Sequence, residues 1–271
     1  MNKWELVDIQ GHIKLRNRLR GTMKKITSKE MKSIELNILK DVAKFCDSNQ
    51  LRYFLCGGTL LGAVRHHGFI PWDDDMDIAM PRVEYKKFLM IYNREKSKYQ
   101  VSAIENNQNW HMPFARVEDL STILFEKTLK QKYRKLHVFI DVFPIDGIPD
   151  SPKIERNFML KQKFLGIIVN ASSFCFFPSR HYSDSKETHI SLKNSVRTFM
   201  KYIAILLFSF VNTQYIIRKM NTNAEKYVLE KTKDIGLTVF VWNWTFEKSS
   251  NHSFKERKKF KFEDSECWGP A

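Results

Sequence analysis

The stretch CGGTLLGAVRHHGFIPWDDDMDIAM, residues 56–80, places a pair of glycines upstream of four aspartates that fall within five residues. The pattern around it predicts, in order, a strand over 52–56, a turn at the glycines, a short helix over 59–67, a loop, and a strand over 76–80. This order of elements places a tight turn after one strand and a group of acids just before another. The stretch therefore decides the fold class and the candidate site together.

Asp75 and Asp77 alternate with Met76 and Ile78. Because alternate side chains of a strand point to the same face, the two acids are predicted to project together while the apolar pair enters the core. Two carboxylates that face each other repel unless a cation lies between them. Carboxylate oxygens suit Mg²⁺ or Mn²⁺, so we expect this pair to bind one of these metals.

The neighbouring acids are assigned by their position on the same strand. Asp73 is expected to join the metal site if the strand begins early, and otherwise to lie on the loop and tune the site. Asp74 is expected to point away. Asp141, alone in the apolar run VFIDVF, must be paired, hydrogen-bonded or metal-bound if it is buried, and we predict it as a further metal ligand. Asp146, in PIDG, is predicted as a turn residue.

The glycine pair Gly57-Gly58 predicts a phosphate site. A strand, a Gly-Gly turn and a helix start leave backbone N–H groups pointing outward, where they can hold phosphate oxygens. Thr59 can add a hydroxyl, and Arg65 lies about two helical turns along. A phosphate cradle, two carboxylates on one strand and a third on another strand make up a nucleotidyltransferase-type arrangement.

Other interpretations of the aspartates are less consistent with the sequence. A solvated loop is the usual explanation of an isolated DDD run, but it does not account for the glycines or for Asp141. An EF-hand loop needs a Gly at its sixth position and a distal Glu, and neither is present. Phosphatases of the D-x-D-x-T type place their acids after the apolar strand, whereas here the acids precede it.

The rest of the chain predicts an α+β fold, with a mixed β-sheet flanked by helices. Thr27 and Glu30 form a T-x-x-E capping box ahead of a helical apolar pattern. Strand-like runs cover 99–104, 112–118, 121–126 and 137–147, and the pattern is mostly helical from Pro152 to about residue 233. We predict a basic segment over 1–26, a catalytic core over 27–150 and a mainly helical region over 151–271, with the boundary between Pro149 and Pro152.

The charge of the chain favours an anionic partner. Of its 271 residues 45 are Lys or Arg and 30 are Asp or Glu, for a formal net charge of +15, and basic clusters occupy 11–32, 127–135 and 255–261. Two apolar runs, 164–177 and 202–211, are shorter than the ~20 residues needed to cross a bilayer. With their basic flanks they predict buried helices or a peripheral contact with a membrane.

The cysteines and the amino terminus indicate a compartment. The four cysteines are scattered, without CxxC or zinc spacing, and the first residues contain no apolar signal segment. We therefore expect free thiols and a cytoplasmic protein, peripheral on the inner face of the cell membrane.

Three segments resemble one known family. GGTLLGAVRHHGFIPWDDDMDIAMPRVEYKKFL (57–89), FARVEDLST (114–122) and HVFIDVFPIDGIP (137–149) closely resemble the LicD/fukutin family, whose bacterial members are phosphocholine transferases. The resemblance runs from about residue 28 to 150 and is thin beyond it. Family members continue past an FED…GP segment into a tyrosine- and glycine-containing motif, so part of the acceptor side or of the core's closure is expected beyond FEDSECWGPA.

The resemblance implies a nucleotidyltransferase core and transfer of phosphocholine, or a related phospho-alcohol, from a CDP-linked donor. The acceptor it implies is a sugar hydroxyl of a cell-surface glycan, such as a teichoic-acid or lipopolysaccharide precursor, and we expect that acceptor to be lipid-linked. Mg²⁺ or Mn²⁺ on Asp75, Asp77 and Asp141 would bridge the donor diphosphate. Arg65 or Arg116, taken as surface residues, would neutralise the leaving CMP.

The choline group needs aromatic faces. Trp72, Trp110 and Phe114 are the candidates closest to the motifs, and each has the alternative role of a core residue. The head group and the acceptor sugar are left open by the sequence.

Two alternatives differ in class. A glycosyltransferase whose D-x-D pair holds a nucleotide sugar through Mn²⁺ shares the acids but does not need the glycine cradle. A basic nucleic-acid-binding protein would use the net charge, but the basic clusters contain no recognised binding motif and the acids would have no role. We therefore expect no nucleic-acid partner.

Overall fold

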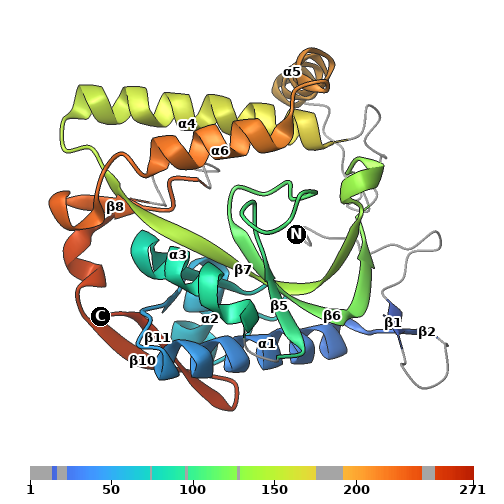
Figure 1. The fold of residues 1–271 in the computed structure, drawn as a ribbon, viewed down its shortest axis with the longest axis vertical. Coiled ribbons are helices and arrows are strands. Elements are labelled where there is room, and N and C mark those ends of the chain that lie inside the picture. The colour runs from blue at the N-terminus through green and yellow to red at the C-terminus, as the bar shows by residue number, and fades with distance from the viewer. Residues whose placement is uncertain are drawn as a thin grey trace.

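The computed structural model describes residues 14–16, 23–73, 75–94, 97–126, 129–174, 192–239 and 248–271. Figure 1 shows helices on both sides of a curled sheet. The helices are α1 (Ser28–Ser48), α2 (Gly57–His66), α3 (Arg82–Ile91), α4 (Pro152–Ser173), α5 (Leu192–Phe208) and α6 (Thr213–Ala224). The strands are β1 (Lys14–Arg16), β2 (Met23–Lys25), β3 (Phe54–Leu55), β4 (Asp77–Pro81), β5 (Tyr99–Ser102), β6 (Ala115–Phe125), β7 (Lys135–Ile148), β8 (Asp234–Gly236), β9 (Lys248–Ser250), β10 (Arg257–Phe262) and β11 (Ser265–Pro270).

Strand β7 lies at the centre of the sheet and pairs with three other strands. In the described residues the strands form a nine-stranded sheet with the order β2-β1-β6-β7-β4-β3, to which β5 adds on β6, and β8 and β9 add beyond β7. β7 pairs antiparallel with β6 and β8 and parallel with β4. The sheet is therefore mixed and the fold is α+β, as the sequence predicts.

The two faces of the sheet carry different cores. On one face Ile78 and Val142 pack with α1 and α3, and on the other Ala79 and Phe143 pack with α4, α6 and β8. Figure 1 shows α4 and α6 along one side of β7 and α1 along the other. Because side chains alternate along a strand, the odd-numbered residues of β4 and β7 face α4 and α6.

Helix α1 begins as predicted. The Thr27 hydroxyl accepts the Glu30 N–H at 3.2 Å, and the Glu30 carboxylate accepts the Thr27 N–H at 2.8 Å, so both halves of the capping box form.

The second half of the chain returns to the sheet and to the first core. The two runs predicted over 112–118 and 121–126 form the single strand β6, whose register shifts between Asp119 and Leu124. β8 pairs with β7, and the hairpin of β10 and β11 places Phe262 and Cys267 in the core beside α1. The region over 151–271 thus contains strands as well as helices, and the predicted domain boundary stays a prediction.

No individual helix in the described residues combines the length and the apolar composition needed to cross a membrane. Phe199–Phe208 and Thr213–Lys231 meet those criteria only as a pair, which is bent by 104°.

Candidate active site

Three charged residues form a row across three neighbouring strands. Asp77 of β4 is the register partner of Asp141 of β7, and Asp141 is in turn the partner of Arg116 of β6. All three are on the sheet face that α4 and α6 cover, opposite Ile78, Val142 and the other residues of the first core. Strand pairing alone therefore brings together two acids that are 64 positions apart in the sequence.

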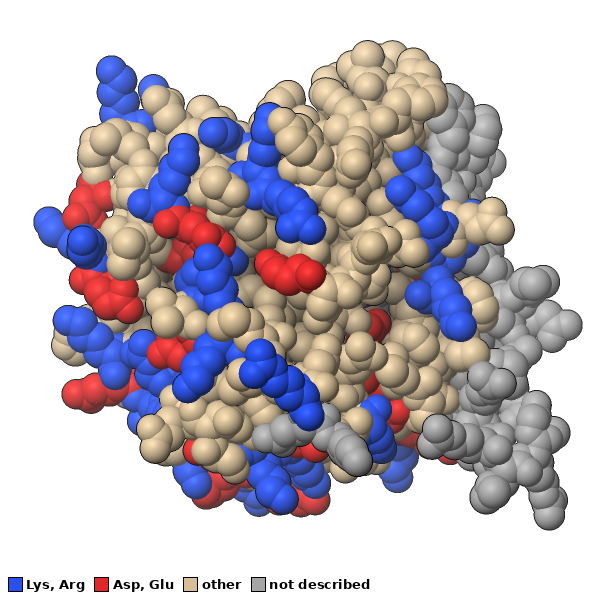
Figure 2. All heavy atoms as spheres, in the orientation of Figure 1, with Lys and Arg blue, Asp and Glu red and all other residues tan. Residues whose placement is uncertain are grey.

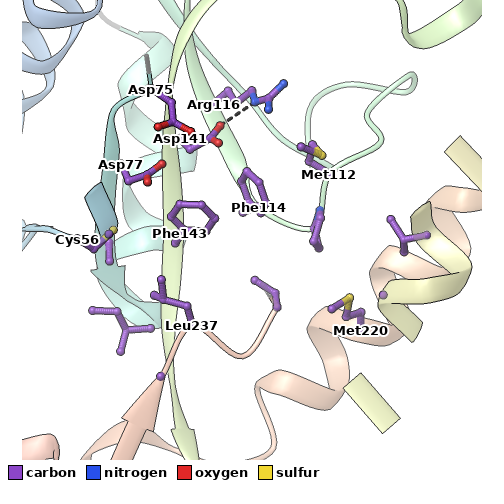
Figure 3. Close-up of a pocket in the computed structure, with 18 of the residues that line it drawn as sticks. Cys56, Asp75, Asp77, Met112, Phe114, Arg116, Asp141, Phe143, Met220 and Leu237 are labelled. Atoms are coloured by element: carbon purple, nitrogen blue, oxygen red, sulfur yellow. Dashed lines mark hydrogen bonds and ion pairs between the residues drawn. The ribbon is translucent and has the colours of Figure 1, made fainter. Parts of the chain in front are cut away.

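The alternation predicted around the aspartates is present in the structure. Met76 and Ile78 are buried in the first core, while Asp75 and Asp77 line a cavity on the opposite face. Figure 3 shows these two carboxylates beside that of Asp141. The strand begins at Asp77, so Asp73 lies on the preceding loop, the second of the two positions expected for it. Asp74 lies outside the described residues.

Arg116 holds Asp141. Its Nε donates to Asp141 Oδ1 at 2.7 Å, and its guanidinium carbon lies 3.6 Å from the centre of the Phe139 ring. The side chain of Arg116 has no exposed surface. The expectation of a surface arginine was therefore wrong, because the pairing of β6 with β7 places Arg116 beside Asp141 and over the ring of Phe139.

The glycine pair forms the first turn of α2 directly against the acids. A Cβ on Gly57 would lie 2.8 Å from Asp77 Oδ2, and a Cβ on Gly58 would overlap Asp73 Oδ2. Gly57 also has a φ of +54°, which only glycine adopts readily. Glycine is needed at both positions so that the start of α2 can approach the carboxylates.

Thr59 links α2 to β4. Its hydroxyl accepts the Asp77 N–H at 2.8 Å, and the residue is buried outside the cavity. The structure thus gives Thr59 a positioning contact with the backbone of Asp77. The predicted contact of its hydroxyl with phosphate stays a prediction.

Cys56, which precedes α2, lies in the field of all three acids. Burial raises the pKa of its thiol, and the charges of Asp77, Asp141 and Asp75 raise it further, in that order. The thiol of Cys56 is therefore close enough to all three carboxylates for their charges to affect its pKa. The three described cysteines, of which Cys56 is one, are free thiols, as expected.

The acids lie at one side of a cavity of about 930 Å³ between the sheet and α4. Its other walls come from β3, α2, the segment before β6, α4, β8 and the carboxyl-terminal hairpin. Figure 3 shows Asp75, Asp77 and Asp141 together at one end, with Phe114 and Phe143 next to them and Met220 across the space. The cavity has the size of a ligand site, with an acidic end and a mainly apolar body.

The predicted choline-binding aromatics separate into two groups. Phe114 lines the cavity, with its ring centre 4.3 Å from that of Phe143. Trp110 is buried and donates its indole N–H to the Phe114 carbonyl at 2.8 Å, so it supports this wall from behind. Trp72 is 68% exposed, and neither it nor Arg65 lines the cavity.

Sequence reasoning missed several cavity residues. Phe143 lies two positions after Asp141, so the same strand period could have found it. His111, which stacks on Tyr133 with ring centres 5.0 Å apart, has a pKa lowered to about 3 by burial and, secondarily, by the charge of Arg116. Leu237 and Pro270 reach the cavity from elements far along the chain, which no local pattern indicates.

The prediction made for Asp146 was wrong. It is a buried residue of β7 rather than a turn residue, and both of its oxygens accept from Arg82, at 2.7 and 2.6 Å. Thr238 donates to it as well, at 3.0 Å. The turn signal of the PIDG sequence was overridden because β7 continues through Pro144, which pairs with Met80 of β4.

The donor set at the acidic end fits a hard cation in its chemistry. Within the residues that the structure describes, no three His, Cys, Asp or Glu side chains form a ready-made metal cage. Mg²⁺ is commonly held by one or two carboxylates together with substrate phosphates and water, rather than by a cage of protein ligands. Asp75, Asp77 and Asp141 could hold Mg²⁺ or Mn²⁺ in this way, with Asp73 near the start of α2.

Comparison with known proteins agrees with this architecture. A family profile described as LicD/FKTN/FKRP, nucleotidyltransferase domain, matches residues 50–184. The lipopolysaccharide cholinephosphotransferase LicD of Haemophilus influenzae is 38% identical over 143 residues, which are 52% of this chain and 52% of that protein. An uncharacterized protein of Rickettsia typhi is 32% identical over 126 residues, 46% of this chain and 38% of that protein. The chain thus matches about half the length, or less, of these relatives. Through its residues 50–184, the chain belongs to the LicD/FKTN/FKRP nucleotidyltransferase-domain family.

Proposed function

We propose that this protein transfers phosphocholine, or a related phospho-alcohol, from a CDP-linked donor to a sugar hydroxyl of a cell-surface glycan precursor. The observation that carries the proposal is the register of Asp77 with Asp141 at the acidic end of a ligand-sized cavity, directly against the first turn of α2. The similarity to a lipopolysaccharide cholinephosphotransferase supports the choice of head group and of acceptor class.

The acidic end is assigned to the donor diphosphate. Mg²⁺ or Mn²⁺ bound by Asp75, Asp77 and Asp141 would neutralise charge on the diphosphate and on the leaving group. The N–H groups at the start of α2, next to Gly57 and Gly58, would bind phosphate oxygens, which the helix dipole favours. The metal held by the acids and the N–H groups at the start of α2 would therefore bind the same diphosphate.

Asp141 is assigned to the acceptor. Arg116 fixes one of its oxygens, so the carboxylate keeps one orientation toward the cavity. From there it would orient the attacking sugar hydroxyl or accept its proton. The hydroxyl oxygen forms a bond to the phosphorus that carries choline, the bond from that phosphorus to the CMP oxygen breaks, and CMP leaves.

The apolar body of the cavity is assigned to the head group. Phe114 and Phe143 present two tilted rings next to the acids, and aromatic faces attract quaternary ammonium groups. A choline linked to the reacting phosphorus would lie within reach of this pair. Other phospho-alcohols lack the cationic methyl groups and would gain less from these rings.

The proposal is tested by incubating the protein with CDP-choline, Mg²⁺ and a glycan acceptor extracted from membranes. The expected result is release of CMP with addition of phosphocholine to the acceptor, both lost in EDTA and in Asp77→Asn. Asp264→Asn is the matched control, because Asp264 lies on the exposed turn between β10 and β11 and pairs with Lys40. Addition of a hexose from a nucleotide sugar, with no reaction of CDP-choline, would replace the proposal with the glycosyltransferase alternative.

A further inference from the structure

Helix α4, which lines the cavity, and helix α5, which packs beside it, expose large apolar side chains to solvent. The exposed apolar side chains include Leu160, Phe164 and Ile167 on α4, and Phe199, Met200, Leu206, Leu207 and Phe210 on α5 and just after it. Phe210 is 92% exposed and Leu207 is 64% exposed, so these side chains are not covered by the rest of the described chain. We call this set the α4–α5 surface. Large apolar side chains exposed in such numbers on neighbouring helices indicate an interaction site.

Contacts with the rest of the fold hold the α4–α5 surface in place. Ile205 of α5 is 2% exposed, so one side of the helix is anchored while its neighbours face outward. The ring of Phe208 meets that of Phe164 on α4 edge to face, with centres 6.1 Å apart. The Lys130 ammonium donates to the Ser209 carbonyl at the end of α5. These contacts fix α5 beside α4 and hold its apolar residues outward.

The helices that form and support this surface are mostly basic. Together α4, α5 and α6 contain nine Lys and Arg residues and a single acid, Glu155 in the first turn of α4. In Figure 2 the surface over α5 is tan, without red or blue spheres, and blue spheres lie below it on both sides. An apolar surface bordered by basic side chains is complementary to a bilayer that contains anionic lipids.

We infer that the α4–α5 surface binds the face of an anionic phospholipid bilayer. The helix α5 would lie in the interface plane with Leu206, Leu207 and Phe210 among the acyl chains, while lysines of α4 and α5 reach the headgroup phosphates. This binding does not depend on the proposed reaction.

The same surface leads into the cavity. Ile167 is 51% exposed and also lines the cavity, and Lys163 and Asn170 line the cavity from the same helix. A bilayer that covers α4 and α5 would therefore lie next to this wall of the cavity. A substrate with a lipid anchor could reach the cavity without leaving the membrane.

Two other partners could cover an apolar surface. A second copy of the chain is disfavoured by charge, because both copies would bring the same excess of basic residues to the interface. An acidic protein partner would match the charge, but it would not need apolar side chains in such numbers on a single helix. Both are included as outcomes of the test.

The test is co-sedimentation of the full chain with vesicles of phosphatidylcholine alone and of phosphatidylcholine with phosphatidylglycerol. The expected result is binding to the anionic vesicles that weakens as salt is raised. The variant with Leu206→Ser, Leu207→Ser and Phe210→Ser should bind at least ~10-fold more weakly, because its acyl-chain contacts are removed. Its matched control carries Val64→Ser, Val83→Ser and Met90→Ser on α2 and α3, which are also exposed, and should bind like the wild type.

Two further double variants test the contribution of the basic side chains. Lys161→Glu with Lys201→Glu should weaken binding to anionic vesicles, whereas Lys44→Glu with Lys87→Glu, exposed on α1 and α3, should have a smaller effect. Light scattering of each variant reports self-association. The inference is overturned if anionic vesicles do not bind the protein, if the two serine variants bind equally, or if the α5 variant changes only the oligomeric state. Because the vesicles contain no donor, a failure of the proposed transfer reaction leaves this result unaffected.

Discussion

Asp77 and Asp141 are register partners on adjacent parallel strands, and their carboxylates face the same cavity. Two carboxylates this close in a mostly apolar surrounding are unfavourable unless cations compensate them. Arg116 compensates one of them through its bond to Asp141. We place the proposed divalent metal at this end of the cavity, because carboxylate oxygens such as those of Asp75 and Asp77 suit Mg²⁺ and Mn²⁺.

Arg116→Met should destabilise the protein strongly. The arginine has no exposed surface, and its loss would leave Asp141 without its bond to the guanidinium, at a cost of roughly 3–5 kcal/mol. The double variant with Asp141→Asn should recover part of this loss. Arg52→Met, which breaks the more exposed pair with Glu84, should cost at most about 1 kcal/mol. Urea unfolding of the four proteins measures these differences, and equal losses for Arg116→Met and Arg52→Met would contradict the role of Arg116.

Gly57→Ala should lower both stability and CMP release. The substitution forces a side chain into the left-handed region, at about 1–2 kcal/mol, and brings its Cβ within 2.8 Å of Asp77 Oδ2. Gly166→Ala is the comparison, because its Cβ would meet only Met220 Cε at 3.7 Å. In the interior of α4 that change should stabilise the protein by roughly 0.5–1 kcal/mol. Thermal unfolding and CMP assays on both variants check the contrast, which would be absent if the start of α2 had no part in the site.

Thr59→Val should act through Asp77. The substitution keeps the shape of the side chain but removes the acceptor of the Asp77 N–H, at a cost of about 1–3 kcal/mol for a buried donor. Thr59→Ser keeps the hydroxyl and should stay close to the wild type. The two variants are compared by urea unfolding. Equal losses in valine and serine would mean that the methyl group matters rather than the hydrogen bond.

His111 should make the protein less stable in acid. Burial, with the charge of Arg116, lowers its pKa to about 3 in the folded state, so the unfolded chain alone takes up the proton between that pH and about 6.5. The contribution to stability is complete above pH ~6.5 and is lost as the pH falls, by at most ~1.4 kcal/mol per pH unit. His111→Gln should flatten this part of the curve. Urea unfolding at pH 7, 6 and 5 tests it, and parallel curves for wild type and variant would contradict the assignment.

The sequence predicted what depends on local pattern. The period of two placed Met76 and Ile78 in the core and Asp75 and Asp77 on the other face, and the T-x-x-E box located the start of α1. The bond between Arg116 and Asp141 depends on the register of β6 with β7. No pattern within either segment encodes that register, so Arg116 could be taken for a surface residue.

The packing of the residues after 150 could not be predicted from local sequence patterns either. The hairpin of β10 and β11 packs in the first core through Phe262 and Cys267, and Pro270 reaches the cavity. Strand β10 has the sequence RKKFKF, a mostly basic run in which only Phe262 is buried, so its composition indicates a surface segment rather than part of a core. Its packing is decided by contacts with distant elements, such as the bond from the Trp268 N–H to the hydroxyl of Tyr53, 215 positions earlier.

The most direct test of the central claim is calorimetric titration of CDP-choline into the protein, with Mg²⁺ and with EDTA. The account predicts binding that requires Mg²⁺ and that is lost in Asp77→Asn, while Asp264→Asn binds like the wild type. Binding of CDP-choline that is equally tight in EDTA and in Asp77→Asn would contradict the assignment of the acidic end of the cavity to a metal-bound diphosphate.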